Sequence, residues 1–393
     1  MKFQVAKSDL EFALNTVAGA LGAGDSDIGS HFVFRILPGT TDQVQVLASS
    51  NRIYAHCTVP KAKVTEEGPA FTVEGWRLKG WIGMVGDVAL DVETLDNAEI
   101  QIKGGKYALR FRSLDATHFQ YMDKTLANAN LTGKIAAKRL SAALKAAKSF
   151  ASTDETNKPD VVTMDIKNGL LMATDKSSVV VFFTLKDLAN VSMRIHVKDV
   201  SGVSGFLDNI DGDVEILDAK RVVFLKRVSD GAVYGETRYQ IEFPNLNYAD
   251  EVDQRLWKVG VTELRAAAQN GFFGASKTDS RMFLHPVENG QIKVSMKTDT
   301  NTGMFASVYV ACDETPDPNN ANIPEVPKDG FPVSHPHVIA LLDAFADEKF
   351  IELGINVDPV KKKRYIRVTK RVFVDDKDGT FDKYVFVLAG MVW

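Results

Sequence analysis

The chain has 393 residues, of which 45% are apolar and 25% charged, the proportions of an ordinary globular protein. Lysine and arginine total 47 against 51 aspartate and glutamate, so the net charge of −4 excludes a strongly basic nucleic-acid binder but not a locally basic surface. Two cysteines, Cys57 and Cys312, argue against a disulfide-built secreted scaffold. The N-terminus has no signal-peptide run, and the longest dense apolar stretch is far below the roughly 18 residues that span a bilayer. We therefore expect a cytoplasmic protein without a membrane partner.

In chain order, the sequence first predicts a short strand and a helix over 7–21, where apolar residues recur at helical spacing. A strand, a small polar turn and a second strand follow over 44–59. Residues 71–93 then predict a second helix flanked by strands, and 100–111 predict a hairpin with a polar tip. These segments make up one structural unit.

The same four features recur twice in the same order, which indicates internal repetition. They are the helices, hairpins, flanked helices and polar-tipped hairpins over 137–151, 170–185, 195–217 and 222–243, and then over 262–276, 292–310, 331–354 and 365–388.

Two polar stretches without apolar periodicity, 122–133 and 245–255, are predicted linkers. They divide the chain into three copies, over 1–123, 134–247 and 256–393. Each copy contains two helices and several antiparallel strands. This pattern is typical of an α+β fold and not of a parallel βαβ sheet.

The residues that could support catalysis are scattered. His335 and His337 lie at a predicted helix start without cysteine ligands nearby, which favours a packing role over a zinc site. Asp165 and Asp175 could pair as carboxylates, but alternation along a strand explains them equally well. We therefore predict no catalytic residue, no metal and no cofactor.

Several segments resemble the bacterial and phage β-type sliding clamps, the rings that tether a replicative DNA polymerase to its template. They are the opening MKF-x-V, the run IQIKGGKYALRFRSLDATHF, the segments MATDKSSVVVFF and YQIEFPNLNYAD, and the closing KYVFVLAGMVW. The resemblance covers the whole chain, and its specificity comes from the three copies in order.

The resemblance implies the DNA clamp fold, in which each copy contributes two helices to an inner wall and antiparallel sheets to an outer wall. Two chains joined head to tail would close a ring around duplex DNA. Ring closure removes sheet edges and makes the grip topological. The DNA could then slide, since phosphate contacts carry no sequence information. Such a protein is a non-enzymatic processivity factor.

The resemblance also implies which basic side chains face DNA. Only the helix over 137–151 is clearly basic. The candidates are Arg77, Lys134, Lys138, Arg139, Lys145, Lys148, Lys198, Arg265 and Lys277.

A pocket for polymerase and clamp-loader peptides should lie between the second and third copies. The matching positions are Val161, Thr174, Lys176, Ser177, Ser178, Val179, Pro244, Leu246, Val385, Val387, Leu388 and Met391. The sequence departs from the family here, because Lys-Ser-Ser at 176–178 replaces the usual Gly-His-Arg and the tail AGMVW replaces a Met-Pro-rich ending. We read this divergence as pointing to a phage-encoded or otherwise specialised replication system.

The ring interface matches Leu109 and Phe111 of the first copy and Phe272 and Phe273 of the third. Two large rings at a helix end would be costly to expose, so an interface between chains is one explanation. Burial within their own copy is the alternative explanation for the two phenylalanines.

Two other functions are compatible with the sequence. One is a structural virion or scaffold protein that uses the same repeats without encircling DNA. The other is a metal-dependent hydrolase that uses Asp165 and Asp175.

Overall fold

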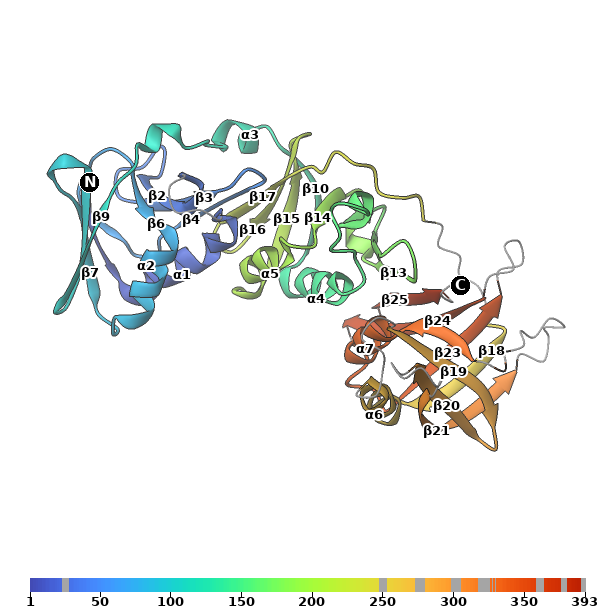
Figure 1. The fold of residues 1–393 in the computed structure, drawn as a ribbon. Helices are drawn as coiled ribbons and strands as arrows, with labels where there is room; N and C mark the ends of the chain where they lie inside the picture. Colours follow the sequence, from blue (N-terminus) through green and yellow to red (C-terminus); the bar gives the residue numbers. More distant parts are fainter. Residues whose placement is uncertain are drawn as a thin grey trace. The chain divides into compact units, whose positions relative to one another are not determined.

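The computed structural model describes residues 1–22, 28–246, 253–272, 280–297, 305–316, 326, 328, 330–357, 364–375 and 380–389 (Figure 1). The chain forms two compact units. The first comprises Met1–Lys145 with Lys198–Gln240, and the second comprises Ala146–Val197 with Ile241–Trp393. The boundaries pass through the middle copy, because each half of that copy shares a sheet with a neighbouring copy.

One order of elements recurs along the chain: a strand, a helix, four strands, a second helix and three strands, with one additional strand in the first copy. The helices that recur are α1 (Lys7–Val17), α2 (Gly75–Met84), α4 (Ala137–Lys148), α5 (Val200–Asp208), α6 (Val261–Phe272) and α7 (His335–Ala344). Every strand pairing among the described residues is antiparallel, so the α+β prediction is confirmed.

The larger sheet of the first unit joins strands of the first and second copies. Its order is β10 (Asn130–Ala136), β15 (Asp213–Asp218), β16 (Val222–Arg227), β17 (Val233–Thr237), β4 (Ile53–Thr58), β3 (Val44–Ser49), β2 (His31–Ile36) and β6 (Phe71–Glu74). The two copies meet where β17 pairs with β4, with Val233 opposite His56. We call this pairing the first junction.

The second sheet of the first unit belongs to the first copy alone. Its order is β5 (Lys63–Glu66), β1 (Lys2–Ala6), β7 (Ala89–Thr94), β8 (Glu99–Gly104) and β9 (Tyr107–Arg112). Strand β9 therefore lies at a sheet edge in the described structure. An unpaired edge is a template for pairing with another strand.

The second unit contains one continuous sheet. Its order is β14 (Ser192–His196), β11 (Thr163–Lys167), β12 (Leu170–Thr174), β13 (Val179–Thr184), β25 (Thr380–Ala389), β24 (Arg364–Asp375), β23 (Phe350–Val357), β18 (Arg255–Gly260), β21 (Phe305–Pro316), β20 (Gln291–Lys297), β19 (Arg281–Glu288) and β22 (Phe331–Ser334). The second and third copies meet where β13 pairs with β25, with Phe182 opposite Val385. This second junction repeats the antiparallel geometry of the first.

The apolar faces of the helices form the core, as their periodicity predicts. Leu10 and Leu14 of α1 and Leu140 and Leu144 of α4 are fully buried. Burying one leucine stabilises the fold by about 1.5–3 kcal/mol relative to leaving it exposed. These spacings therefore select which helix face meets a sheet.

Helices of neighbouring copies approach closely in the first unit. The 3₁₀ turn η1 (Ala18–Ala20), which continues α1, packs against α5. A Cβ atom added to Gly19 would lie 2.6 Å from the Cα atom of Gly202, far inside van der Waals contact. Glycine is therefore required for this approach.

The predicted linker 122–133 includes regular secondary structure. It contains a short helix, α3 (Asp123–Ala127), and the first residues of β10. The sequence did not predict this helix because its five residues make little more than one turn. That length is too short to show an amphipathic pattern. Met122, Leu126 and Ala129 nevertheless have the spacing of one helix face.

A buried histidine makes the stability of the first unit depend on pH. Burial, and secondarily the charge of Arg35, lowers the pKa of His56 from 6.5 to about 4. Between pH 6.5 and about 4 the unfolded chain binds a proton on His56 that the folded chain excludes. The free energy of unfolding is therefore not reduced by His56 above pH 6.5, and it falls as the pH drops from 6.5 to about 4.

We expect acidification across this window to cost about 3 kcal/mol of unfolding free energy through His56. Urea unfolding at a series of pH values measures the slope, and a His56→Gln variant should show a shallower one. Equal slopes for the variant and the parent protein would contradict this assignment.

Candidate nucleic-acid interface and apolar partner surface

Three basic residues of α4 and β10 are exposed and face carboxylates. Lys134 of β10 pairs with Asp213 at 3.0 Å, Lys138 pairs with Asp211, and Lys145 pairs with Asp208. The buried face of α4 carries leucines, so the lysines lie on its solvent side. The three carboxylates come from the end of α5, the start of β15 and the residues between them.

These pairings change the electrostatic character of the predicted surface. The hydrogen bond with Asp211 raises the pKa of Lys138, and the same bond lowers the pKa of Asp211. Exposed ion pairs are weak and are screened by salt, so a phosphate can displace the carboxylates. The lysines of this surface can therefore exchange their carboxylate partners for other anions, which makes weak contacts with phosphates feasible.

The remaining predicted DNA contacts are dispersed. Arg77 is exposed and pairs with Glu74 at 3.1 Å, while Arg265 of α6 pairs with Asp343 of α7 in the second unit. Arg139 and Lys148 are half-buried. Lys277 lies outside the described residues.

Lys198 lines a cavity of about 630 Å³ in the first unit. Arg52 and His118 line the same cavity, and Arg52 pairs with the buried Asp199 at 2.9 Å. The cavity therefore combines two formal cations with one carboxylate at the start of α5. Lys198 is itself exposed and lies at the edge of this cavity.

An apolar cluster surrounds the second junction. It consists of Val161, Met172, Phe182, Phe243 and Val385, with the half-buried Leu170, Val180, Leu246 and Val387 packed against it. We call these nine residues the second-junction cluster. Four of the predicted pocket positions belong to it: Val161, Leu246, Val385 and Val387.

Strand alternation separates the other predicted pocket residues. Val179 pairs with Leu388, and each alternates with a cluster residue, so both side chains face the other side of the sheet, where they are buried. Pro244 is half-buried beside the cluster residue Phe243, and Met391 lies outside the described residues.

Sequence reasoning missed Leu170, Met172, Val180, Phe182 and Phe243. A usable signal was present, because Leu170 and Met172 alternate on one predicted strand and Val180 and Phe182 alternate on its partner. The pairing of Met172 with Phe182 places all four on one face.

The turn between β12 and β13 is held by Asp175. Its carboxylate accepts hydrogen bonds from the backbone N–H groups of Ser177, Ser178 and Val179 and from the Ser178 hydroxyl at 2.6 Å. Burial works to raise the pKa of Asp175, but these hydrogen bonds outweigh it and lower the pKa. The turn is therefore ordered by its own carboxylate.

Two further contacts anchor this turn. Ser178 Oγ lies 3.1 Å from Nδ1 of His337 in α7, and Lys176 pairs with Asp160 at 2.7 Å. Thr174 is buried and donates its hydroxyl to the carbonyl of Val179. The residues at 176–178 therefore define the polar edge of the second junction.

The two carboxylates proposed for a hydrolase do not share a site. Asp165 is buried beside Arg194, whose Nε lies 3.2 Å away, whereas Asp175 belongs to the turn. The strand register puts Asp165 opposite Met172, roughly 10 Å along the strand from Asp175. Within the described ranges, no group of three or more metal-binding side chains occurs. The hydrolase hypothesis gains no support.

The predicted interface residues of the first copy lie on β9. Phe111 is buried within its own unit and Leu109 is half-buried, while Tyr107 on the same strand face is 47% exposed. The side chain of Phe272 and the whole of Phe273 lie outside the described residues. In the part of the chain that the structure covers, no helix combines the length and apolar content needed to cross a membrane.

No protein-family profile and no curated protein matches the sequence. Solved structures do match it along its length. The DNA polymerase III beta subunit of Thermotoga maritima superposes with a TM-score of 0.79 at 17% identity, covering 100% of this chain and 99% of that one. The beta subunit of Pseudomonas aeruginosa and the sliding clamp of Bacillus subtilis each give 0.77 at 14% identity, covering 100% of both chains. The chain therefore has the fold of the DNA polymerase III beta subunits, the sliding-clamp fold.

Proposed function

We propose that this protein is a sliding clamp, a non-catalytic ring that encircles duplex DNA and tethers a replicative polymerase. The observation that carries the proposal is the full-length match to sliding clamps with the same fold. The three copies over 1–123, 134–247 and 256–393 are the structural units of the proposed ring. We place its action in the cytoplasm of a bacterial cell, with a phage genome as the proposed source.

The strand edges support closure by a second chain. At both junctions, the last strand of one copy pairs with the third strand after the first helix of its neighbour. These pairs are β17 with β4 and β25 with β13, and the equivalent strand of the third copy is β21. By the same rule, β9 should pair with β21 of another chain. Within the described residues, 305–311 of β21 pair with β20 on one side only. Two such contacts would close a head-to-tail homodimer, with Leu109, Phe111, Phe272 and Phe273 beside them.

The DNA contacts would be independent of sequence. Lys134, Lys138 and Lys145 offer exchangeable charges to phosphates. Because such contacts position a duplex without reading its bases, they are compatible with sliding. A topological link supplies the persistence that these weak contacts lack.

The partner surface is the second-junction cluster. Its half-buried apolar side chains offer a place for the apolar residues of a short peptide from a polymerase or a clamp loader. The polar edge at 176–178 would select among such peptides.

We expect the protein to stay on circular DNA in high salt and to leave when that DNA is cut. The protein is first threaded onto linear duplex over its free ends, the ends are ligated, and the circle is washed in high salt. Electrostatic binding alone fails as salt rises, whereas a topological link survives until a restriction enzyme opens the circle. Retained protein is measured by gel filtration of the DNA.

A matched pair of variants controls the ring interface. Tyr309 on β21 is 62% exposed, and Leu131 on β10 is 59% exposed. Tyr309→Arg should abolish retention and halve the mass in solution, whereas Leu131→Arg should do neither. Loss of the parent protein from ligated circles in high salt would contradict the clamp and favour the scaffold alternative.

A further inference from the structure

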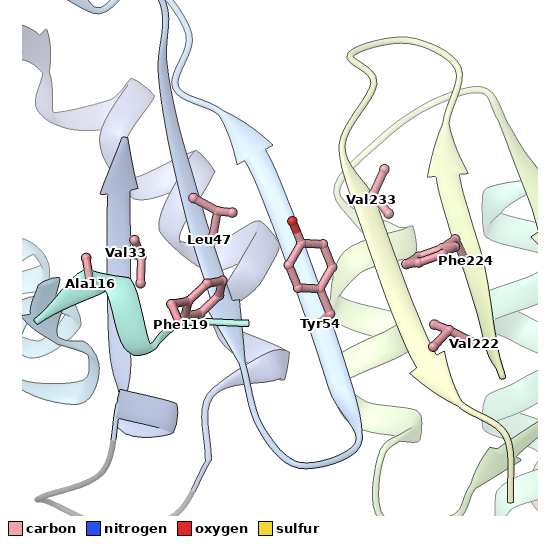
Figure 2. Close-up of a cluster of buried hydrophobic side chains, with 8 residues drawn as sticks. All are labelled: Val33, Leu47, Tyr54, Ala116, Phe119, Val222, Phe224 and Val233. Atoms are coloured by element: carbon pink, nitrogen blue, oxygen red, sulfur yellow. The ribbon is translucent and has the colours of Figure 1, made fainter. Parts of the chain in front are cut away.

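The first junction carries an apolar cluster that corresponds to the one at the second junction. Its buried members are Val33, Leu47, Tyr54, Ala116, Phe119, Val222, Phe224 and Val233 (Figure 2). We call these eight residues the first-junction cluster.

The two clusters occupy equivalent strands. Leu47 of β3 corresponds to Met172 of β12, and both precede the polar turn of their copy. Val233 of β17 and Val385 of β25 both come from the strand that crosses into the neighbouring copy. The chain therefore builds two apolar surfaces of one design.

A segment of the chain covers the first surface. Tyr121, Met122, Leu126 and Ala129 are half-buried and pack against the first-junction cluster. We call residues 121–129 the covering segment. At the second junction, the half-buried residues on the cluster are Leu170, Val180, Leu246 and Val387, and of these Leu246 belongs to the predicted linker 245–255, in which the structure describes 245–246 and 253–255.

A polar contact fixes the covering segment in register. Arg35 of β2 donates two hydrogen bonds to the Asp123 carboxylate, at 2.8 and 2.6 Å, and two to Gln45 Oε1. The guanidinium also lies 4.8 Å from the centre of the Tyr121 ring. A planar guanidinium with a carboxylate and an aromatic ring is a pattern of specific recognition.

The covering segment has the properties of a bound peptide more than those of a core element. None of its residues is buried, and its helix, α3, has five residues. Its contacts combine apolar anchors in and directly beside α3 with a single charged contact. A peptide helix laid on an apolar surface uses the same combination.

We propose that the first junction is a second peptide-binding site, occupied in cis by the covering segment. Its ligand class is a short helical peptide with apolar anchors spaced like Met122 and Leu126 and an acidic residue directly after the first anchor, for Arg35. The site goes beyond the proposed clamp function and does not depend on it, since the chain's own segment serves as the probe.

The test detaches the covering segment by substitution, which gives the opened protein, and then adds the same segment as a separate peptide. The full chain carries Met122→Ser, Asp123→Asn and Leu126→Ser, and the probe is a fluorescent peptide with the sequence of residues 120–130, QYMDKTLANAN. We expect saturable binding of one peptide per chain, measured by fluorescence anisotropy, at least about tenfold tighter than to the parent protein.

Two matched controls test the charged contact. A probe with lysine in place of its aspartate should bind the opened protein about tenfold more weakly, because it loses the charge-assisted hydrogen bonds to Arg35. Adding Arg35→Met to the opened protein should remove the difference between the two probes. Equal binding of the probe to the opened and parent proteins, or no binding to a folded opened protein, overturns the proposal.

If the opened protein does not fold, a single substitution tests the same proposal. In Asp123→Lys, repulsion from Arg35 should detach the segment while its apolar residues remain. The amides of Leu126 and Ala129, which donate to the carbonyls of Met122 and Leu126, should exchange hydrogen much faster than in the parent, while β3 and β4 stay protected. Unchanged protection of these two amides, or loss of protection in β4 as well, overturns the proposal.

Discussion

In a Leu246→Asp variant we expect peptide affinity at the second-junction cluster to fall about 100-fold, equivalent to roughly 3 kcal/mol. Leu246 is half-buried and packs against the buried members of the cluster, so its side chain forms part of the apolar surface that a partner would cover. A carboxylate at this position would lose apolar contact and would have to be desolvated without a partner when a peptide binds.

Peptides selected on the parent protein from a random display library provide the probes, and fluorescence anisotropy measures their affinity. Val228→Asp is the matched control, because Val228 is 50% exposed and lies outside the cluster. It should leave the affinity unchanged. If the selected peptides bind Leu246→Asp as tightly as the parent, the partner surface lies elsewhere. Retention on circular DNA should be normal in both variants, which separates partner binding from ring closure.

The second large effect concerns Arg227, whose side chain is fully buried between two helices. It donates hydrogen bonds to the carboxylate of Asp230, to the carbonyl of Phe206 in α5 and to the hydroxyl of Thr16 in α1. Its guanidinium also lies 5.3 Å from the ring centre of Phe12. One side chain thus connects the helices of the first and second copies.

We expect Arg227→Met to lower the free energy of unfolding by about 3 kcal/mol, the low end for breaking a buried ion pair, since Asp230 keeps partial access to water. Methionine preserves much of the apolar contact with the two helices, so the loss reports the polar contacts. Urea unfolding followed by circular dichroism measures the change. Arg221→Met, at an exposed position of the same copy, should shift the transition by less than about 0.5 kcal/mol. Equal shifts in the two variants would contradict a structural role for Arg227.

Much of the fold follows from local patterns along the chain. Leu10 with Leu14 and Leu140 with Leu144 mark the buried faces of α1 and α4, because helical geometry places residues four apart on one side. The alternating strands around the polar turns predict antiparallel hairpins, and β12 and β13 form one. These features depend on neighbours in sequence, and the α+β architecture follows from them.

The details of the candidate sites depend on contacts between distant residues. Lys138 and Lys145 were identified by their charge, but their acidic partners, Asp211 and Asp208, lie 73 and 63 positions further along the chain. Arg35 and Asp123, 88 positions apart, gave no sign of their contact. Charge can be counted from a sequence, whereas pairing requires the position of the partner.

The periodicity of apolar residues, with its threefold recurrence, was enough to establish the class of fold and the order of the six recurring helices and their hairpins, because these arise from interactions within a few turns or strands. It did not predict the strands β2, β5, β11 and β19. The continuity of sheets between copies, the side of β13 on which Val179 and Val180 face, and the covering of the first-junction cluster by residues 121–129 required the folded chain. Each depends on strand register and on which distant surface a segment meets. Chain folding sets those relations through packing over long separations, which leaves no periodic trace in the sequence.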